Sequence, residues 1–295
     1  MCPSLFFSTD SFISIVFTNG NLLFFSPTPK HATNDLHSTG SSSTNQSFNA
    51  SQGLGQQILA AFALSGAHGA VVDLKQYSAD QSVKSLQREV TSAKLPPAKL
   101  HGYECDTSSE ESVKFTWSRI VSGFGTVNIL VTNAGITGGA PAEDYPFEDF
   151  KQMIDVNLSG TFLFAGQAVK WMIDSGVKGR ILMVSSMSRT IVNRPQKQAA
   201  YNASKAASSQ LMKSLAAESA PHGIRVNALS PGYIETAANA GEEMEELSKK
   251  WIKDNPMGRI AKPEEFRGTA AWLCSDASSY VTGSEILVDG GYVVW

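Results

Sequence analysis

The chain has 295 residues, enough for one large domain or two small ones. Hydrophobic residues make up 42% and charged residues 17%, a composition typical of soluble globular proteins. A formal net charge of −3 gives no electrostatic attraction to nucleic acid or acidic membranes, so neither is an expected partner. No apolar run is long enough to span a bilayer.

The cysteines and histidines give no sign of a metal site. Cys2, Cys105 and Cys274 are scattered, so free thiols in a reducing compartment are the favoured interpretation. The five histidines have no ligand spacing. The first lysine is Lys30 and the first arginine is Arg88, which argues against a secretory or transit peptide. We therefore expect a cytoplasmic protein without a metal.

Residues 1–52 form an atypical, partly disordered amino-terminal segment. Residues 3–29 are rich in Phe, Leu, Ile and Ser. Residues 31–52 are rich in Ser, Thr and Asn, which is typical of loops or disorder. Residues 12–20 are the one stretch of this segment that resembles a strand.

From residue 53 to residue 295, short apolar strands alternate with helices. The expected strands cover residues 69–74, 99–106, 127–131, 180–186, 224–229 and 285–289. The expected helices cover residues 56–66, 80–93, 108–124, 147–175, 199–220 and 263–275. This alternation predicts a single α/β domain with a parallel sheet covered on both faces and right-handed crossovers. Ligands of such sheets bind beyond the carboxyl ends of the strands.

A glycine pair and an aspartate near the first two expected strand–helix junctions suit a dinucleotide. Gly53-Leu54-Gly55 precedes a helix, where backbone without a Cβ can approach a pyrophosphate. Asp73 closes the next strand, where a carboxylate can accept hydrogen bonds from the adenosine ribose. A 2′-phosphate would meet the like charge of Asp73, although Lys75 could relieve the repulsion. NAD is therefore favoured over NADP.

Two further strand ends carry candidate binding residues. Asp106 ends the second strand after the glycine pair, and Asn133-Ala134-Gly135 makes a sharp turn against which a flat ligand can lie. Each of these features, taken singly, also fits an ordinary turn between a strand and a helix.

Tyr201 and Lys205 lie four residues apart and therefore share one face of a helix. A phenol titrates near pH 10, so it exchanges protons poorly at about pH 7 unless a cation favours the phenolate. The pair suits acid/base chemistry on an alcohol or ketone. Ser186, or alternatively Ser188, can hydrogen-bond a substrate oxygen. Asn157, inside an expected helix, indicates a kink with a backbone-bound water, or an ordinary surface Asn.

Together these residues resemble the short-chain dehydrogenase/reductase family over residues 53–295. The matching elements are Thr132-Asn133-Ala134-Gly135, Asp106, Asn157, Ser186, the Tyr201/Lys205 pair, Ser230-Pro231-Gly232 with Thr236, and Val288-Asp289-Gly290-Gly291. The resemblance implies a Rossmann-like, doubly wound fold with a seven-stranded parallel sheet. It also implies a nicotinamide cofactor, NAD or NADP.

The resemblance assigns a role to each site residue. Tyr201 would be the catalytic acid/base and Ser186 would orient the substrate. Lys205 would hold the nicotinamide ribose and lower the pKa of Tyr201, and Asn157 would fix a proton-relay water. The implied cofactor-binding residues are Gly53, Leu54, Gly55, Asp73, Asp106, Asn133, Ala134, Gly135, Tyr201, Lys205, Ile234 and Thr236.

Within the family, residues 185–193 and 201–205 are similar to those of fungal polyol and sugar reductases, a group with sorbose reductase, mannitol 2-dehydrogenase and D-arabinitol dehydrogenase. The expected activity is hydride transfer between NAD(P) and a sugar alcohol or ketose. Reduction of secondary-metabolite carbonyls shares the chemistry and stays open. The resemblance also implies a homodimer or homotetramer formed through the helix with Tyr201 and the helix before it.

The amino-terminal segment departs from the family pattern, which is a strand followed by Thr-Gly-x-x-x-Gly-x-Gly. Twelve residues separate Thr39-Gly40 from Gly53. Using residues 12–20 as the strand needs a link of more than thirty residues, where such loops run about 2–6. Either the first strand is displaced, or a mistranslated piece replaces the natural residues 1–50, which we favour. The second interpretation predicts a chain that binds the cofactor badly or does not fold. The disrupted strand and glycine loop also leave open a dinucleotide-binding protein with impaired catalysis.

Overall fold

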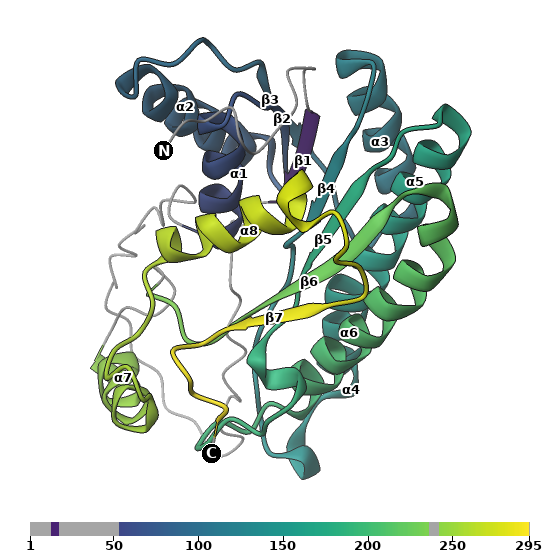
Figure 1. The fold of residues 1–295 in the computed structure, drawn as a ribbon. Helices are drawn as coiled ribbons and strands as arrows, with labels where there is room; N and C mark the ends of the chain where they lie inside the picture. The colour runs from purple at the N-terminus through teal and green to yellow at the C-terminus, as the bar shows by residue number, and fades with distance from the viewer. Residues whose placement is uncertain (1–12, 18–52, 236–241, 295) are drawn as a thin grey trace, which may run out of the picture.

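A computed structural model describes residues 13–17, 53–235 and 242–294 (Figure 1). Seven strands form one parallel sheet in the order β3-β2-β1-β4-β5-β6-β7. The strands are β1 (Ile13–Phe17), β2 (His68–Asp73), β3 (Leu100–Glu104), β4 (Ile129–Thr132), β5 (Arg180–Val184), β6 (Arg225–Pro231) and β7 (Glu285–Val288). The helices are α1 (Leu54–Leu64), α2 (Gln76–Ser92), α3 (Glu110–Phe124), α4 (Phe147–Ile154), α5 (Gly160–Ser175), α6 (Ala199–Ser219), α7 (Glu242–Asp254) and α8 (Arg267–Cys274).

The central strand of the sheet comes from the amino-terminal segment. The backbone of β1 pairs in parallel with β2 on one side and β4 on the other, with Ile15 opposite both Ala70 and Leu130. This is the displaced strand of the first interpretation, although we favoured a replaced segment. Residues 18–52, which connect β1 to α1, lie outside the described residues, so the origin of the segment stays a prediction.

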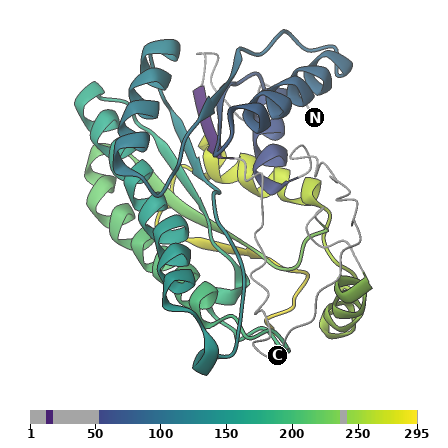
Figure 2. The same cartoon turned by 180° about the vertical axis from the view of Figure 1, so that it is seen from behind.

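Helices cover both faces of the sheet, with α1, α2 and α8 on one and α3, α5 and α6 on the other (Figures 1 and 2). The strands serve both faces because successive side chains point to opposite sides. In β2, Ala70 and Val72 pack with the α3–α5–α6 layer, while Val71 between them packs with the α1–α8 layer. Such burial on both faces explains the continuous apolar runs and confirms the predicted fold class.

Three helical regions differ from the prediction. A π-helical turn, Asp155–Ser159, interrupts the long helix expected over residues 147–175. The helix expected over 263–275 starts as a 3₁₀ turn, Pro263–Phe266. Helix α7 was not expected, because its many charged residues obscure the one-turn spacing of Leu247 and Trp251. No helix in the described ranges is both long and apolar enough to cross a membrane.

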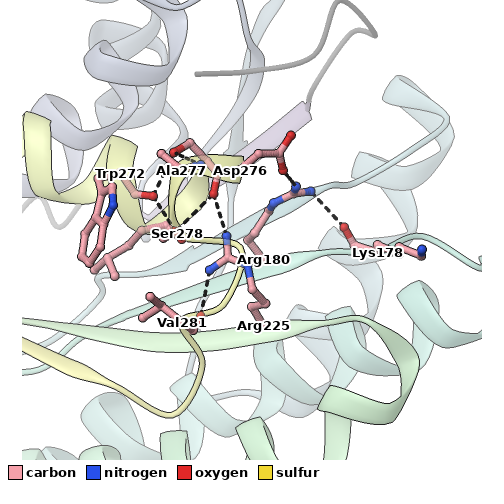
Figure 3. Close-up of polar contacts among 10 residues, drawn as sticks. Lys178, Arg180, Arg225, Trp272, Asp276, Ala277, Ser278 and Val281 are labelled. Carbon is pink, nitrogen blue, oxygen red and sulfur yellow. Dashed lines mark hydrogen bonds and ion pairs between the residues drawn. The ribbon is translucent and has the colours of Figure 1, made fainter. Parts of the chain in front are cut away.

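Two arginines tie the turn after α8 to the amino end of the sheet (Figure 3). Arg180 and Arg225 begin β5 and β6 and lie opposite each other in the register. Arg180 forms an ion pair with Asp276, while Arg225 donates hydrogen bonds to the carbonyls of Ser275, at 2.9 Å, and Val281, at 3.0 Å. Burial, with the nearby Arg180 charge, lowers the pKa of Arg225. These contacts support the fold at the edge opposite the strand carboxyl ends.

Candidate active site

The four candidate catalytic residues meet beyond the carboxyl ends of β4 and β5. Tyr201 and Lys205 come from α6, Ser186 follows β5, and Asn157 lies in the π-helical turn. The Tyr201 hydroxyl interacts with Ser186. The Lys205 ammonium lies 5.7 Å from the centroid of the Tyr201 ring. Asn157 donates a hydrogen bond of 3.0 Å to the hydroxyl of Ser204, which lies between Tyr201 and Lys205 on α6. Residues that are up to 48 positions apart in the chain therefore form one site.

Burial dominates the electrostatics of the Tyr201/Lys205 pair. Lys205 is only 5% exposed, and desolvation lowers its pKa to about 8. Burial also raises the pKa of Tyr201, against a smaller lowering by Ser186. Burial outweighs the groups that lower the Tyr201 pKa, so the lowering of this pKa by Lys205 stays a prediction. The Lys205 ammonium instead donates to the Val184 carbonyl, at 3.0 Å.

Of the two candidate serines, Ser186 is the one beside Tyr201. Its hydroxyl accepts a hydrogen bond from the Ser188 N–H at 3.2 Å and lies 3.1 Å from the Ser188 hydroxyl. The Ser188 hydroxyl contacts Ser186, and it lies 3.4 Å from the side-chain nitrogen of Gln198. The choice of Ser186 stays a prediction, which this arrangement supports.

Asn157 joins the turn after β4 to α6. Its Oδ1 accepts from the Ile136 N–H at 2.7 Å and its Nδ2 donates to the Ile136 carbonyl at 3.0 Å. The side chain is buried, so it is not the surface Asn of the alternative interpretation. Its own carbonyl accepts from the hydroxyls of Thr161, at 2.9 Å, and Ser208, at 3.3 Å. Because two protein donors already reach this carbonyl, the relay water stays a prediction.

The glycine pair and Asp73 lie where the sequence placed them. Gly53 is the N-cap of α1 with extended backbone, no side chain caps the helix, and its first turn has no acidic residue. The N–H groups of this turn therefore suit a pyrophosphate. Leu54 and Gly55 belong to the same turn. Asp73 is buried at the end of β2, where its Oδ1 accepts from the Lys75 N–H at 3.2 Å.

The turn after β4 packs closely against two of the candidate catalytic residues. A Cβ on Gly135 would lie 3.2 Å from Asn157 Oδ1 and 3.6 Å from Lys205 Nζ. Asn133 and Ala134, which precede Gly135, are half-buried. The close approach of the turn to Asn157 and Lys205 therefore needs a glycine here. The uncapped first turn of α1 suits a pyrophosphate, and the buried Asp73 suits the adenosine ribose. The residues present therefore fit a nicotinamide dinucleotide.

The remaining cofactor candidates occupy other strand ends. Asp106 lies after β3, where its Oδ1 accepts from the Ser108 N–H at 2.9 Å and from its hydroxyl at 2.6 Å. Ile234 follows β6 and forms a bridge with Ala261. Thr236 lies outside the described residues. The binding roles of these residues stay predictions.

A polar network that the sequence did not reveal lies next to Ser188. Gln198 and Asn193 are buried, and an amide hydrogen bond of 2.9 Å joins them. Asn193 donates to the Tyr233 hydroxyl at 3.2 Å, and the Tyr233 ring stacks on Trp251 with centroids 3.9 Å apart. The polar residues just before Tyr201 were the one local sign of this network. Nothing in the sequence around Tyr233, after β6, or Trp251, in α7, indicated that they belong to it.

Comparisons with known proteins identify the family of the chain. A family model described as enoyl-(acyl carrier protein) reductase matches residues 49–293. The NADH-dependent L-xylulose reductase of Ambrosiozyma monospora is 36% identical over 248 residues, 78% of this chain and 91% of that protein. The chain belongs to the short-chain dehydrogenase/reductase family.

Two further members of the family show the same relationship. The ribulose-forming D-arabinitol 2-dehydrogenase of Candida tropicalis is 35% identical over 254 residues, 83% of this chain and 90% of its own length. The crystal structure of NAD⁺-bound xylitol dehydrogenase matches with a TM-score of 0.75 and 26% identity, covering 95% of this chain and 98% of that one.

These matches confirm several sequence-based predictions. This short-chain dehydrogenase/reductase is an oxidoreductase with a Rossmann-like fold, it uses a nicotinamide dinucleotide, and it interconverts an alcohol and a ketone. The predicted similarity to fungal polyol and sugar reductases is also confirmed.

Proposed function

We propose that this protein interconverts a sugar alcohol and the corresponding ketose, with NAD(H) as its cofactor. The observation that carries the proposal is the joint placement of Ser186, Tyr201, Lys205 and Asn157 beside the turn at Gly135. The polyol substrates in the names of the relatives support the substrate class.

Tyr201 acts as the general acid when the ketone is reduced. Because burial raises its pKa, the phenol is protonated at neutral pH and can give its proton to the substrate oxygen. Ser186 donates a hydrogen bond to that oxygen and so orients it. Lys205 has a pKa of about 8, so its ammonium is charged below that pH. This charge stabilises the Tyr201 phenolate that forms when the proton has left. The bound dinucleotide supplies the hydride. Oxidation of the alcohol follows the same path in reverse.

The dinucleotide binds across the carboxyl ends of the strands. The first turn of α1, with Gly53, Leu54 and Gly55, holds the pyrophosphate, and Asp73 accepts hydrogen bonds from the adenosine ribose. The remaining contacts come from Asp106, Asn133, Ala134, Gly135, Tyr201, Lys205, Ile234 and Thr236. NAD is preferred over NADP, because the buried Asp73 carboxylate repels a 2′-phosphate.

The protein acts in the cytoplasm as a homodimer or homotetramer. Cys105 and Cys274 are free, buried thiols, which supports a reducing compartment.

Replacing Tyr201 with Phe tests the proposed function. Nicotinamide absorbance is followed with D-arabinitol, mannitol, sorbose and xylulose, using NAD(H) and NADP(H) in parallel. We expect turnover on at least one polyol–ketose pair, faster with NAD(H). Tyr201→Phe lowers kcat about 10²–10⁴-fold on that pair because the proton donor is gone.

Tyr280→Phe is the matched control, since Tyr280 is fully exposed and far along the chain from the site. It retains the turnover of the wild type. Undiminished turnover of Tyr201→Phe would show that another group moves the proton.

A further inference from the structure

A pocket opens at the outer edge of the sheet, between β3 and the carboxyl-terminal half of α3. Its volume is about 490 Å³, which suits a small organic molecule. The lining residues are Tyr103, Ser118, Arg119, Ser122 and Gly123. Those from α3 share one face of the helix, because they lie about one turn apart. A ligand in this pocket therefore meets all of them together.

This pocket lies apart from the candidate active site. β3 is an edge strand, and β2 and β1 separate it from β4, whose carboxyl end borders the catalytic residues. Because α3 starts after β3 and runs back along it, Gly123 lies towards the amino end of the strand. Lys99, just before β3, agrees with this placement, since its ammonium donates to the Gly123 carbonyl at 2.7 Å. A dinucleotide at the carboxyl ends of the strands does not fill the pocket.

The Tyr103 hydroxyl is a donor at the inner side of the pocket. Tyr103 is only 7% exposed, and its ring belongs to the core. A Cβ on Gly123 would lie 3.1 Å from the hydroxyl, so this end of the side chain reaches the pocket. Burial raises the pKa of Tyr103, against a smaller lowering by the Arg119 charge, so the phenol keeps its proton at neutral pH. No residue that the structure describes accepts or donates a hydrogen bond at this hydroxyl.

Arg119 supplies a positive charge beside that hydroxyl. Its guanidinium carbon lies 5.3 Å from the centroid of the Tyr103 ring and 5.6 Å from that of the Phe115 ring. Two rings restrict the guanidinium, so less entropy is lost when it binds a ligand. Across the described ranges, no acidic side chain forms an ion pair with Arg119. Its N–H donors therefore stay available to a ligand.

The rim of the pocket adds polar groups of the same kind. The exposed Ser122 contributes a hydroxyl, whereas the Ser118 hydroxyl already donates to the Phe115 carbonyl, at 2.7 Å. The Lys99 ammonium, bound to the Gly123 carbonyl, offsets the negative end of the α3 dipole. The pocket thus presents hydrogen-bond donors and positive charge.

We propose that this pocket binds a small oxyanion, through a phosphate or carboxylate group held by Arg119 and Tyr103. A guanidinium forms charge-assisted hydrogen bonds with either group, and a phenol O–H can donate to a further oxygen. The pocket is larger than the charged group alone, so it has room for the rest of a small organic anion. The site goes beyond the proposed function and does not depend on the substrate of the enzyme.

Titration with inorganic phosphate and with acetate tests the site. The protein is first saturated with its nicotinamide dinucleotide, so that the first turn of α1 is already occupied. Binding is followed at constant ionic strength through the ¹H–¹⁵N amide signals of Ser122 and Gly123. We expect saturable shifts with a dissociation constant in about the millimolar range. The anion that binds more tightly identifies the charged group of the ligand.

Two variants remove the proposed donors, and each has a matched control. We expect Arg119→Gln to weaken binding about 10-fold and Tyr103→Phe about 5-fold. Arg88→Gln is the control for charge, because Arg88 is exposed on α2 and, in the part of the chain that the structure describes, forms no ion pair. Tyr77→Phe is the control for the hydroxyl, since Tyr77 is 74% exposed. Neither control changes the dissociation constant.

An unchanged affinity of Arg119→Gln would overturn the site. Equal weakening by Arg88→Gln would also overturn it, because the anion would then respond only to the net charge of the protein. The absence of saturable shifts with both anions up to about 100 mM would overturn it as well. If Tyr103→Phe does not fold, Arg119→Gln decides the outcome, since Arg119 is exposed and its replacement leaves the core unchanged.

Discussion

Lys205 is a charged group held in an environment that disfavours its charge. Its pKa falls from 10.5 to about 8 on folding, because burial removes water from the ammonium. Between about pH 8 and pH 10.5 the unfolded chain binds the proton more tightly than the folded protein. Stability from this group therefore rises with pH across that window, and the full penalty is present below about pH 8. Lys205 therefore destabilises the fold, and its proposed role in the reaction explains why a lysine is present at this position.

Replacing Lys205 with Met is expected to stabilise the protein while it removes activity. The pKa change corresponds to about 3 kcal/mol, of which the lost hydrogen bond to the Val184 carbonyl offsets about 1 kcal/mol. At pH 7 the free energy of unfolding in urea should rise by about 2 kcal/mol.

The difference between Lys205→Met and wild type should shrink as the pH approaches about 10.5, when the unfolded chain also loses its proton. Lys213→Met, on the exposed side of α6, controls for general effects of the substitution. A variant less stable than wild type at pH 7 would show that the ammonium is not penalised by burial.

At the scale of elements, the carboxylate of Glu285 connects β7 to three neighbours. Its Oε1 accepts from Ser209 of α6, at 3.0 Å, and from Ser230 of β6. It also forms an ion pair with Arg189, in the 3₁₀ turn that follows Ser186. Glu285 is buried, so removal of its charge leaves the Arg189 guanidinium without compensation. The ion pair thus supports the turn that presents Ser186 and Ser188.

Glu285→Gln is expected to destabilise the protein by about 2–3 kcal/mol in urea unfolding. The value lies below the range for a fully buried pair because the Arg189 side chain is 23% exposed. Asp174→Asn is the control, since it breaks the exposed Lys170–Asp174 pair on α5. It should change stability by less than about 0.5 kcal/mol. Equal effects of the two variants would mean that the Glu285 pair contributes no more than a surface pair.

On the scale of the whole molecule, α4 and α5 each carry exposed aromatic rings. Phe147 and Phe150 stack with centroids 6.3 Å apart, and both are exposed. Phe162 of α5 is 52% exposed, whereas Phe164 and Leu215 pack into the core. Exposed rings of this kind are typical of association surfaces. They support the homodimer or homotetramer that the family resemblance implies.

Phe162→Asp is expected to weaken this oligomer. A carboxylate buried between two copies would lose its hydration, so the variant should shift toward monomer at micromolar concentrations in size-exclusion chromatography with light scattering. Phe115→Asp is the control, because Phe115 is similarly exposed but lies on α3. An unchanged mass for Phe162→Asp would place the association surface elsewhere.

The sequence by itself determined most of the fold, and it predicted which candidate catalytic residues come together. Alternating apolar strands and helices predicted the parallel sheet, since strands buried on both faces need continuous apolar runs, as at Ile129–Thr132. The one-turn spacing of Tyr201 and Lys205 is a local property of a helix and was therefore readable. Their position beside Ser186 followed from the rule that strand carboxyl ends share one edge.

Only the tertiary structure decided features that depend on distant partners. The place of β1 came from backbone pairing with β2 and β4, which its sequence does not encode locally. The Tyr201 pKa rises because burial outweighs its polar contacts, and burial is not visible in a spacing. Gln198, at the N-cap of α6, is linked through Asn193 to Tyr233 after β6, and Tyr233 stacks on Trp251 of α7, so no local pattern could join them. Such contacts arise only when the chain has folded.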